Sequence, residues 1–275
     1  HRMGRQLVLQ ARRWLPGRPL VLVADNGFSA LEFLAALLRQ RITCVTRLRL
    51  DAALYQPAPL RRPGAVGRPR TKGARLPTLA EVLANKTTRW RRVTVPGWYG
   101  GGDRVVEICS DTAVWRHAGS PVVPIRWVLL RDPCRRFDPQ ALLCTDPAQE
   151  PLQVIRWFVQ RWQLEVTFRE VRDHLGVETQ RQWSGQAIAR TTPCLLGLFS
   201  IVALLAARLN GRARTRVSVS TWYQKQRPTF ADTLAAVRRE IWSEQGFIAS
   251  RRSAETTKIP PALREGIAYA LCQAA

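Results

Sequence analysis

The first fifty residues alternate between helical and strand patterns of apolar positions. Apolar residues among basic ones predict a helix over residues 4–14. The almost wholly apolar run at 19–24 predicts a strand buried on both faces of a sheet, and this strand ends at Asp25. A helix over 30–41 and a β-branched strand over 42–47 follow. This order is typical of a parallel α/β sheet.

The middle of the chain changes character twice. Residues 56–78 are rich in Pro, Gly and Arg, which predicts a basic loop. Short runs of Val, Ile, Leu and Trp between turns then predict a β-rich insertion over about 89–144.

Helical patterns occupy the remainder. Pro151 favours the first position of a long helix over 151–174, and Gly176 is a stop signal after its last turn. Further helices are predicted over 187–209, 229–244 and 260–273. The apolar run at 194–207 is too short to span a bilayer, so we expect a buried helix and no membrane partner.

Charge narrows the function classes. The chain of 275 residues has 43 Lys+Arg against 20 Asp+Glu, a formal net charge of +23. Such an excess favours a polyanionic partner, and nucleic acid is the commonest one. A GC-rich genome also enriches arginine codons, but it does not explain the shortage of acids. The six cysteines form no CxxC pair and the chain has only three histidines, so we do not expect a zinc site. We expect the cysteines to be reduced thiols.

The predicted helix over 151–174 carries a charged edge. Projected at helical spacing, five residues fall within roughly 80° of arc, namely Phe158, Arg161, Glu165, Arg169 and Arg172. An adjoining apolar stripe is predicted to pack on the sheet and consists of Ile155, Val159, Trp162 and Val166. Taken alone, the charges can equally be ordinary i,i+4 ion pairs on a solvated helix.

The spacing of this edge points to a family. Phe158-x2-Arg161-x3-Glu165-x6-Arg172 resembles the Tyr-x2-Arg-x3-Glu-x6-Lys helix of bacterial insertion-sequence transposases of the DDE class. Phe158 in place of Tyr lacks the hydroxyl, and Arg172 in place of Lys keeps the charge but changes its shape. Both departures bear on the contacts with the DNA ends and leave the charge layout intact.

Asp25 is the second anchor of the resemblance. An aspartate just past a buried strand lies at the carboxyl edge of a sheet, where α/β proteins place their sites, although it can also simply cap a turn. The segment from Val23 to Phe28 is similar to that around the second catalytic aspartate of the family. No aspartate precedes Asp25, so we expect the family's first aspartate to lie upstream of residue 1.

The resemblance implies an RNase H-like α/β fold, truncated at its N-terminal strands, with a β-rich insertion and a helical C-terminal region. We expect residues 1–50 to form part of the core, 51–147 the basic loop and insertion, 148–185 the glutamate helix, and 186–275 the C-terminal region. Asp25 and Glu165 would be catalytic ligands of two Mg²⁺ (or Mn²⁺) ions, which favour oxygen ligands. The implied reactions are hydrolysis at transposon ends and transfer of the freed 3′-OH into target DNA.

Several DNA contacts are expected beside the metal ligands. By resemblance, Arg161 and Arg172 would bind phosphates of the transposon end, with Phe158 beside them and Arg169 a weaker candidate. Arg68 and Arg70 lie in an Arg-Pro segment similar to minor-groove hooks, although a basic loop without sequence preference explains them as well. Trp98 would stack on a flipped base, as an insertion tryptophan does in relatives, although core packing is the usual role of a tryptophan.

Two other functions fit parts of the sequence. A transposase remnant could bind DNA without cutting it. A structural RNA-binding protein would explain the arginines, but it has no need of an acid at a strand end. For an active transposase we expect a homodimer on paired DNA ends and a bacterial, cytoplasmic, nucleoid-associated location.

Overall fold

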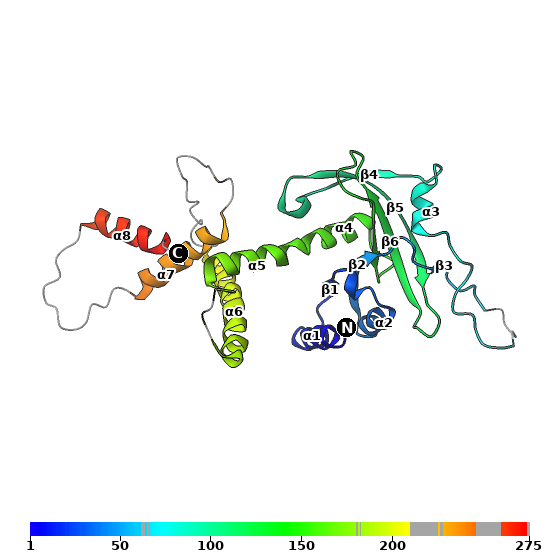
Figure 1. The fold of residues 1–275 in the computed structure, drawn as a ribbon, viewed down its shortest axis with the longest axis horizontal. Helices are drawn as coiled ribbons and strands as arrows, with labels where there is room; N and C mark the ends of the chain where they lie inside the picture. The colour runs from blue at the N-terminus through cyan, green and yellow to red at the C-terminus, as the bar shows by residue number, and fades with distance from the viewer. Residues whose placement is uncertain are drawn as a thin grey trace. The chain divides into compact units, whose positions relative to one another are not determined.

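A computed structural model describes residues 1–61, 64, 66–179, 181, 183–209, 225, 228–245 and 260–273. The chain divides into two compact units, residues 1–163 and 164–275. The first unit is mixed α/β, and the described part of the second is helical (Figure 1). The expected α/β class is therefore confirmed at this coarse level.

One seven-stranded sheet organises the first unit. Its strands are β1 (Leu20–Val23), β2 (Ile42–Leu48), β3 (Leu54–Tyr55), β4 (Arg91–Val95), β5 (Arg104–Trp115), β6 (Val123–Arg131) and β7 (Gln140–Cys144). The unit's helical elements are α1 (Arg2–Trp14), η1 (Asn26–Phe28), α2 (Leu31–Arg39), α3 (Leu79–Ala84), η2 (Trp98–Gly100) and α4 (Pro151–Gln160), and α5 (Trp162–Leu175) begins in it.

The strand order is β1-β2-β7-β6-β5-β3, with β4 also paired to β5. Only β1 and β2 are parallel, with Val23 opposite Val45. All other pairs are antiparallel. The predicted β-rich region thus exists, but β7 pairs directly with β2 and joins it to the core sheet. The expectation of a parallel sheet is correct only for β1 and β2.

Helices cover both faces of this sheet. On one face α2 buries Leu34 and Leu37 against β6 and β7 in one apolar cluster. On the other face α4 buries Ile155 and Val159 in a second cluster that includes Leu142 of β7. The period of two along the strands sends alternate side chains into these two clusters, so both layers are built from the same strands.

Strand β1 is more exposed than its sequence predicts. Within the described strands it pairs only with β2, at one end of the sheet. Val21 is consequently 37% exposed, and no residue of Leu20–Val23 is fully buried. An apolar run alone does not distinguish a central strand from an edge strand.

The long helix that was predicted over 151–174 is divided into α4 and α5. The junction residue Arg161 has φ −53° and ψ −32°, which lie in the helical region. The stop signal at Gly176 is confirmed, since this glycine has φ +78° just after α5. That left-handed conformation suits glycine, which carries no Cβ.

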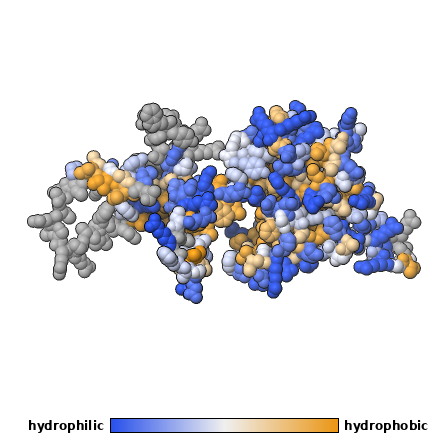
Figure 2. Space-filling view, viewed as in Figure 1, coloured by the Kyte–Doolittle hydropathy of each residue, from blue (hydrophilic) through white to orange (hydrophobic). Residues whose placement is uncertain are grey.

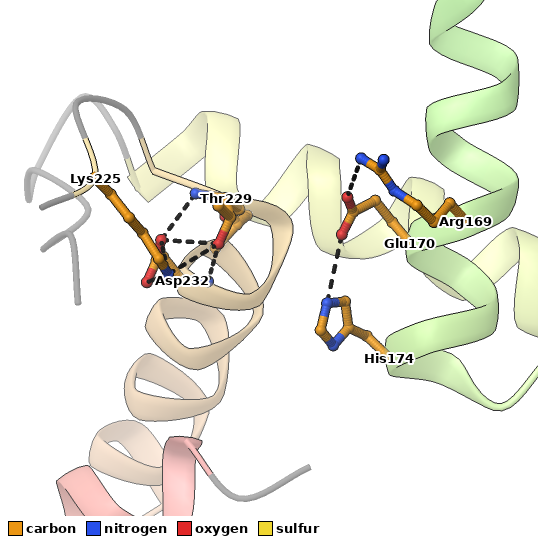
Figure 3. Close-up of polar contacts among 7 residues, drawn as sticks. Arg169, Glu170, His174, Lys225, Thr229 and Asp232 are labelled. Atoms are coloured by element: carbon orange, nitrogen blue, oxygen red, sulfur yellow. Dashed lines mark hydrogen bonds and ion pairs between the residues drawn. The ribbon is translucent and has the colours of Figure 1, made fainter. Parts of the chain in front are cut away.

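The second unit adds α6 (Gly185–Leu209), α7 (Phe230–Gln245) and α8 (Pro261–Gln273) to most of α5. Figure 3 shows how α7 begins: Thr229 and Asp232 cap each other's backbone, and Lys225 lies 3.2 Å from the buried Asp232 carboxylate. Reciprocal capping of this kind satisfies two backbone donors at a helix start.

Helix α6 differs from its prediction. The apolar run was expected to be buried, but Leu198, Ile201 and Leu204 are 39%, 54% and 66% exposed. Only Val202 and Ala206 are buried among its residues, beside Leu234 of α7. Among the described helices, α6 is the one that reaches the length and apolar content needed to cross a bilayer, a test that rests on length and composition.

Candidate active site

Asp25 lies where the sequence placed it, directly after β1. The Ala24 N–H donates to the Val45 carbonyl, which extends the parallel pairing to the residue before Asp25. The buried Thr46 hydroxyl donates to the Asp25 carbonyl at 2.9 Å, and the Phe28 N–H donates to the same carbonyl. The backbone of Asp25 is therefore fixed from two sides. Its side chain is exposed, and its carboxylate makes no hydrogen bond or ion pair within the described residues.

The face of the sheet to which Asp25 belongs follows from strand register. Val23 and Val45 are partners and both pack in the cluster under α4. Asp25 and Arg47 are each two residues further along their parallel strands. Because side chains alternate along a strand, these two positions continue the row toward the carboxyl edge of the sheet on the α4 side.

Arg47 is a residue that the sequence analysis missed. Its Nη2 donates to the Gln140 side chain at 2.9 Å. Its guanidinium carbon lies 5.8 Å from the centre of the Phe158 ring, and that of Arg161 lies 5.9 Å from the same ring. The three residues come from β2, α4 and the end of α4. They form a basic corner, Arg47–Phe158–Arg161, at the edge of the sheet near the end of β1.

Phe158 does not have the position that was expected of it. It is 3% exposed and belongs to the apolar cluster under α4, so its ring is not available to DNA. Contacts of this geometry between cations and an aromatic ring are worth about 0.5–2 kcal/mol. The ring is a core side chain that the Arg47 and Arg161 guanidiniums approach, and its burial corrects the expectation that Phe158 contacts DNA directly.

Glu165 lies in the first turn of α5 and is half-buried. It is the acidic residue in that turn, whereas the sequence predicted it in the middle of one longer helix. Further along α5, Arg169 lies 3.4 Å from the Glu170 carboxylate, whose other oxygen lies 3.4 Å from His174 (Figure 3). The exposed Arg172 is paired at 2.6 Å with Glu178, just beyond the helix. Both arginines on this helix therefore carry acidic partners.

The remaining predicted DNA contacts lie in the first unit. Arg68 and Arg70 are exposed in the basic loop. Trp98 is half-buried: its ring stacks on Phe137 at 5.3 Å, and the Arg104 guanidinium lies 5.7 Å from its centre. Tyr99 contacts both Trp98 and Trp162 edge-on. Trp98 thus already has an aromatic partner, and its stacking on a base stays a prediction.

Cys44 and Cys144 lie on adjacent strands, β2 and β7. Burial, together with the neighbouring Cys144, raises the pKa of the Cys44 thiol to about 12. Burial likewise raises the pKa of Cys144 to about 11. Both remain neutral thiols at ordinary pH, and neutral thiols are poor nucleophiles and poor metal ligands. Neither Cys44 nor Cys144 is therefore a candidate nucleophile or metal ligand.

Within the described residues no cluster of three or more His, Cys, Asp or Glu side chains could hold a metal ion.

The family comparison bears on the first unit: residues 1–104 match the model of a family described as DDE superfamily endonuclease. The match includes Asp25, Arg47 and the basic loop, and it supports a DDE-class, transposase-like endonuclease domain. The expected DDE class is confirmed over these residues, whereas the motif over 158–172 lies outside the match. That family implies nuclease activity on DNA and generally uses divalent metal ions. A search of the curated proteins finds no match.

Proposed function

We propose that this chain is part of a DNA transposase that cuts transposon ends and joins them to target DNA, with Asp25 and Glu165 as metal ligands. The observation that carries the proposal is Asp25: an exposed carboxylate on a fixed backbone at the end of a parallel strand, inside the region that matches the endonuclease family. The carboxyl end of such a strand is where α/β folds place catalytic groups. An RNase H-like core is the fold that we propose for this region.

The available donors suit a hard divalent ion. Asp25 and Glu165 offer carboxylate oxygens, which Mg²⁺ and Mn²⁺ prefer. Two ions bound to these and a third carboxylate would activate the attacking oxygen and stabilise the leaving one. The third carboxylate is the family's first aspartate, which we propose to lie outside residues 1–275.

The basic residues have a separate task, which is to bind and orient the DNA strand. Arg47 and Arg161, held on the Phe158 ring, present fixed cations beside the end of β1. Arginine is suited to this role because its planar guanidinium binds two phosphate oxygens at once. We assign further phosphate contacts to Arg172 and Arg169 on α5. Hydrophilic side chains are spread widely over the face of the first unit that Figure 2 shows.

Other parts of the first unit would contact DNA more loosely. Arg68 and Arg70 would follow the backbone or enter a minor groove. Trp98 would have to leave Phe137 or offer its other face to stack on a base. DNA is the proposed partner throughout, which implies a bacterial, nucleoid-associated location. Pairing of two transposon ends implies a homodimer on DNA, which light scattering with end-sequence duplexes would detect.

A nicking assay tests the proposed reaction. The full-length protein as it is encoded should nick supercoiled DNA in Mg²⁺ or Mn²⁺. Asp25→Asn and Glu165→Gln should each abolish nicking and leave DNA binding in place, because each removes a metal ligand and no phosphate contact. Asp111→Asn is the matched control, since Asp111 is an exposed acid on β5 away from the β1 edge. Unchanged nicking by either site variant would remove that residue from the site.

The alternative is a remnant that binds DNA without cutting it. The observation in its favour is that the described residues hold no group of three metal-ligating side chains. The same assay separates the two functions, since a remnant binds DNA in all variants and nicks in none.

A further inference from the structure

A hollow opens at a gap in the pairing of β5. Strand β5 pairs with β6 over residues 107–115. On its other side, β4 covers residues 104–108 and β3 covers 114–115, so among the described strands the segment 109–113 has no ladder partner on this second side. A cavity of about 540 Å³ lies at the β4 end of this gap, bordered by α3, β4, β5 and the start of α4.

The polar rim of this hollow is predominantly cationic. Arg89 and Arg91 line it, and Arg89 makes no ion pair within the described part of the chain. Ser110 also lines it, and the Ser110 hydroxyl accepts a hydrogen bond from Arg126 of β6. Glu150 is the acid that lines the hollow, 3.9 Å from Arg91. Both members of that pair are more than half exposed, so water screens their attraction and an incoming anion can replace it.

The floor of the hollow is apolar. Val82, Ile108 and the half-buried Cys109 line it beneath the arginines. A site with a cationic rim, an apolar floor and this volume matches a ligand that is itself amphipathic and of small-molecule size. A nucleotide has this character, because its phosphate suits the two guanidiniums and its sugar or base suits the aliphatic floor.

We propose that this hollow binds one nucleotide of a DNA strand, with the phosphate on Arg89 and Arg91 and the sugar or base against Ile108 and Cys109. The inference rests on the proposed function only in its choice of DNA as the source of the nucleotide. It adds a second anchoring point for DNA, whose lining residues include neither Asp25 nor any residue of α5. The approach is open, because Arg89, Arg91 and Glu150 are all exposed.

Cys109 provides a direct probe of occupancy. In the full chain carrying Cys134→Ser and Cys194→Ser, which remove the two exposed thiols, Cys109 is the most accessible cysteine. Its maleimide labelling rate is measured alone, with a short DNA duplex, with deoxyadenosine monophosphate and with inorganic phosphate. A duplex at about ten times its dissociation constant should slow labelling about tenfold, since only the unoccupied fraction reacts. Free nucleotide and phosphate should protect weakly, because they lack the other contacts that DNA makes.

Charge variants complete the test. Arg89→Gln with Arg91→Gln should abolish the protection by DNA, whereas Arg39→Gln, an exposed arginine on α2, should leave it intact. In the Glu150→Gln variant, DNA should protect Cys109 from labelling at a lower concentration than in the parent protein. Equal labelling rates with and without bound duplex would overturn the proposal. Protection by free nucleotide alone would overturn DNA as the source. Nicking is recorded in parallel, so loss of the proposed function is recognised separately from loss of the hollow.

Discussion

The Arg172 guanidinium lies 2.6 Å from the Glu178 carboxylate, so the arginine that the sequence assigns to DNA is already paired with an acid of its own chain. Glu178 has φ +67°, a left-handed conformation that is uncommon for glutamate. The turn after α5 holds it there, with Gly176 and the buried Val177 preceding it. A phosphate that approaches the Nε side of Arg172 must therefore compete with Glu178.

Removing this competing acid should strengthen DNA binding. The Arg172 and Glu178 side chains are 51% and 64% exposed, so their ion pair contributes at most about 1 kcal/mol. Glu178→Gln should therefore tighten DNA binding by at most about fivefold at low salt. Arg172→Gln should weaken binding and lower the slope of log K against log salt by about 1. Fluorescence anisotropy over a salt series measures both. No change in the glutamate variant, with a clear loss in the arginine variant, would show that Glu178 does not compete.

Arg47 should matter for cleavage although no pattern in the sequence marks it. Arg47→Gln should retain the fold while losing the charge, so we expect nicking at subsaturating DNA to fall by about 10-fold, the cost of one charged hydrogen bond. Arg49→Gln is the control, because Arg49 is exposed and paired with Asp51 next to it. Equal nicking rates for the two variants would place Arg47 outside the DNA path.

Glu107 should make stability depend on pH in the acid range. The Arg92 side chain, and Arg131 with it, hold the pKa of the Glu107 carboxyl below its ordinary value. A carboxyl whose pKa is lower in the folded state than in the unfolded state stabilises the folded protein. This stabilisation is complete above the unfolded pKa of about 4.3, and it is lost as pH falls through the folded pKa. Glu107→Gln should therefore be less stable than the parent at neutral pH, and the gap should close in acid. Urea unfolding at several pH values measures the difference in unfolding free energy between parent and variant. A difference that does not change with pH would contradict this account.

The packing of α4 on the sheet gives a test of the fold itself. Leu142 on β7 is fully buried in the cluster under α4. Leu142→Ala should lower the free energy of unfolding by about 2–5 kcal/mol through the cavity it leaves. Val105→Ala, at a position that is 49% exposed, should change it by less than about 0.5 kcal/mol. Equal effects in chemical unfolding would show that β7 and α4 do not pack as described.

Local signals in the sequence predicted much of the fold. Asp25 after an apolar run, Pro151 at a helix start and Gly176 at a helix end all have the positions expected, because each position depends on neighbours in the chain. The strand content of 89–144 was also predictable from its β-branched residues. The pairing of β7 with β2 was not, since the partner residues Val45 and Cys144 are about a hundred positions apart and nothing local specifies their register.

The site was less predictable than the fold. Helical projection put Phe158 on the charged edge, but the sheet buries it, because its neighbours come from β2, β6 and β7. Arg47 was missed for the same reason: Gln140 and Phe158, which hold it, are distant in sequence. Arg172 was found by spacing, but its pairing with Glu178 depends on the turn after α5. Family resemblance gave Asp25 and Glu165 as candidate carboxylates, which stay predictions, and tertiary contacts decide which cations lie near them.

Localised cleavage by Fe²⁺ is the most direct test of whether Asp25 and Glu165 bind the same metal. Fe²⁺ replaces Mg²⁺ at oxygen-ligand sites and, with ascorbate and peroxide, cuts the backbone nearest to it. We predict cuts in the full-length protein near residue 25 and near residue 165, both suppressed by excess Mg²⁺ and both lost in Asp25→Asn. Cleavage at one segment only, or a cut near residue 165 that survives Asp25→Asn, would contradict a shared site.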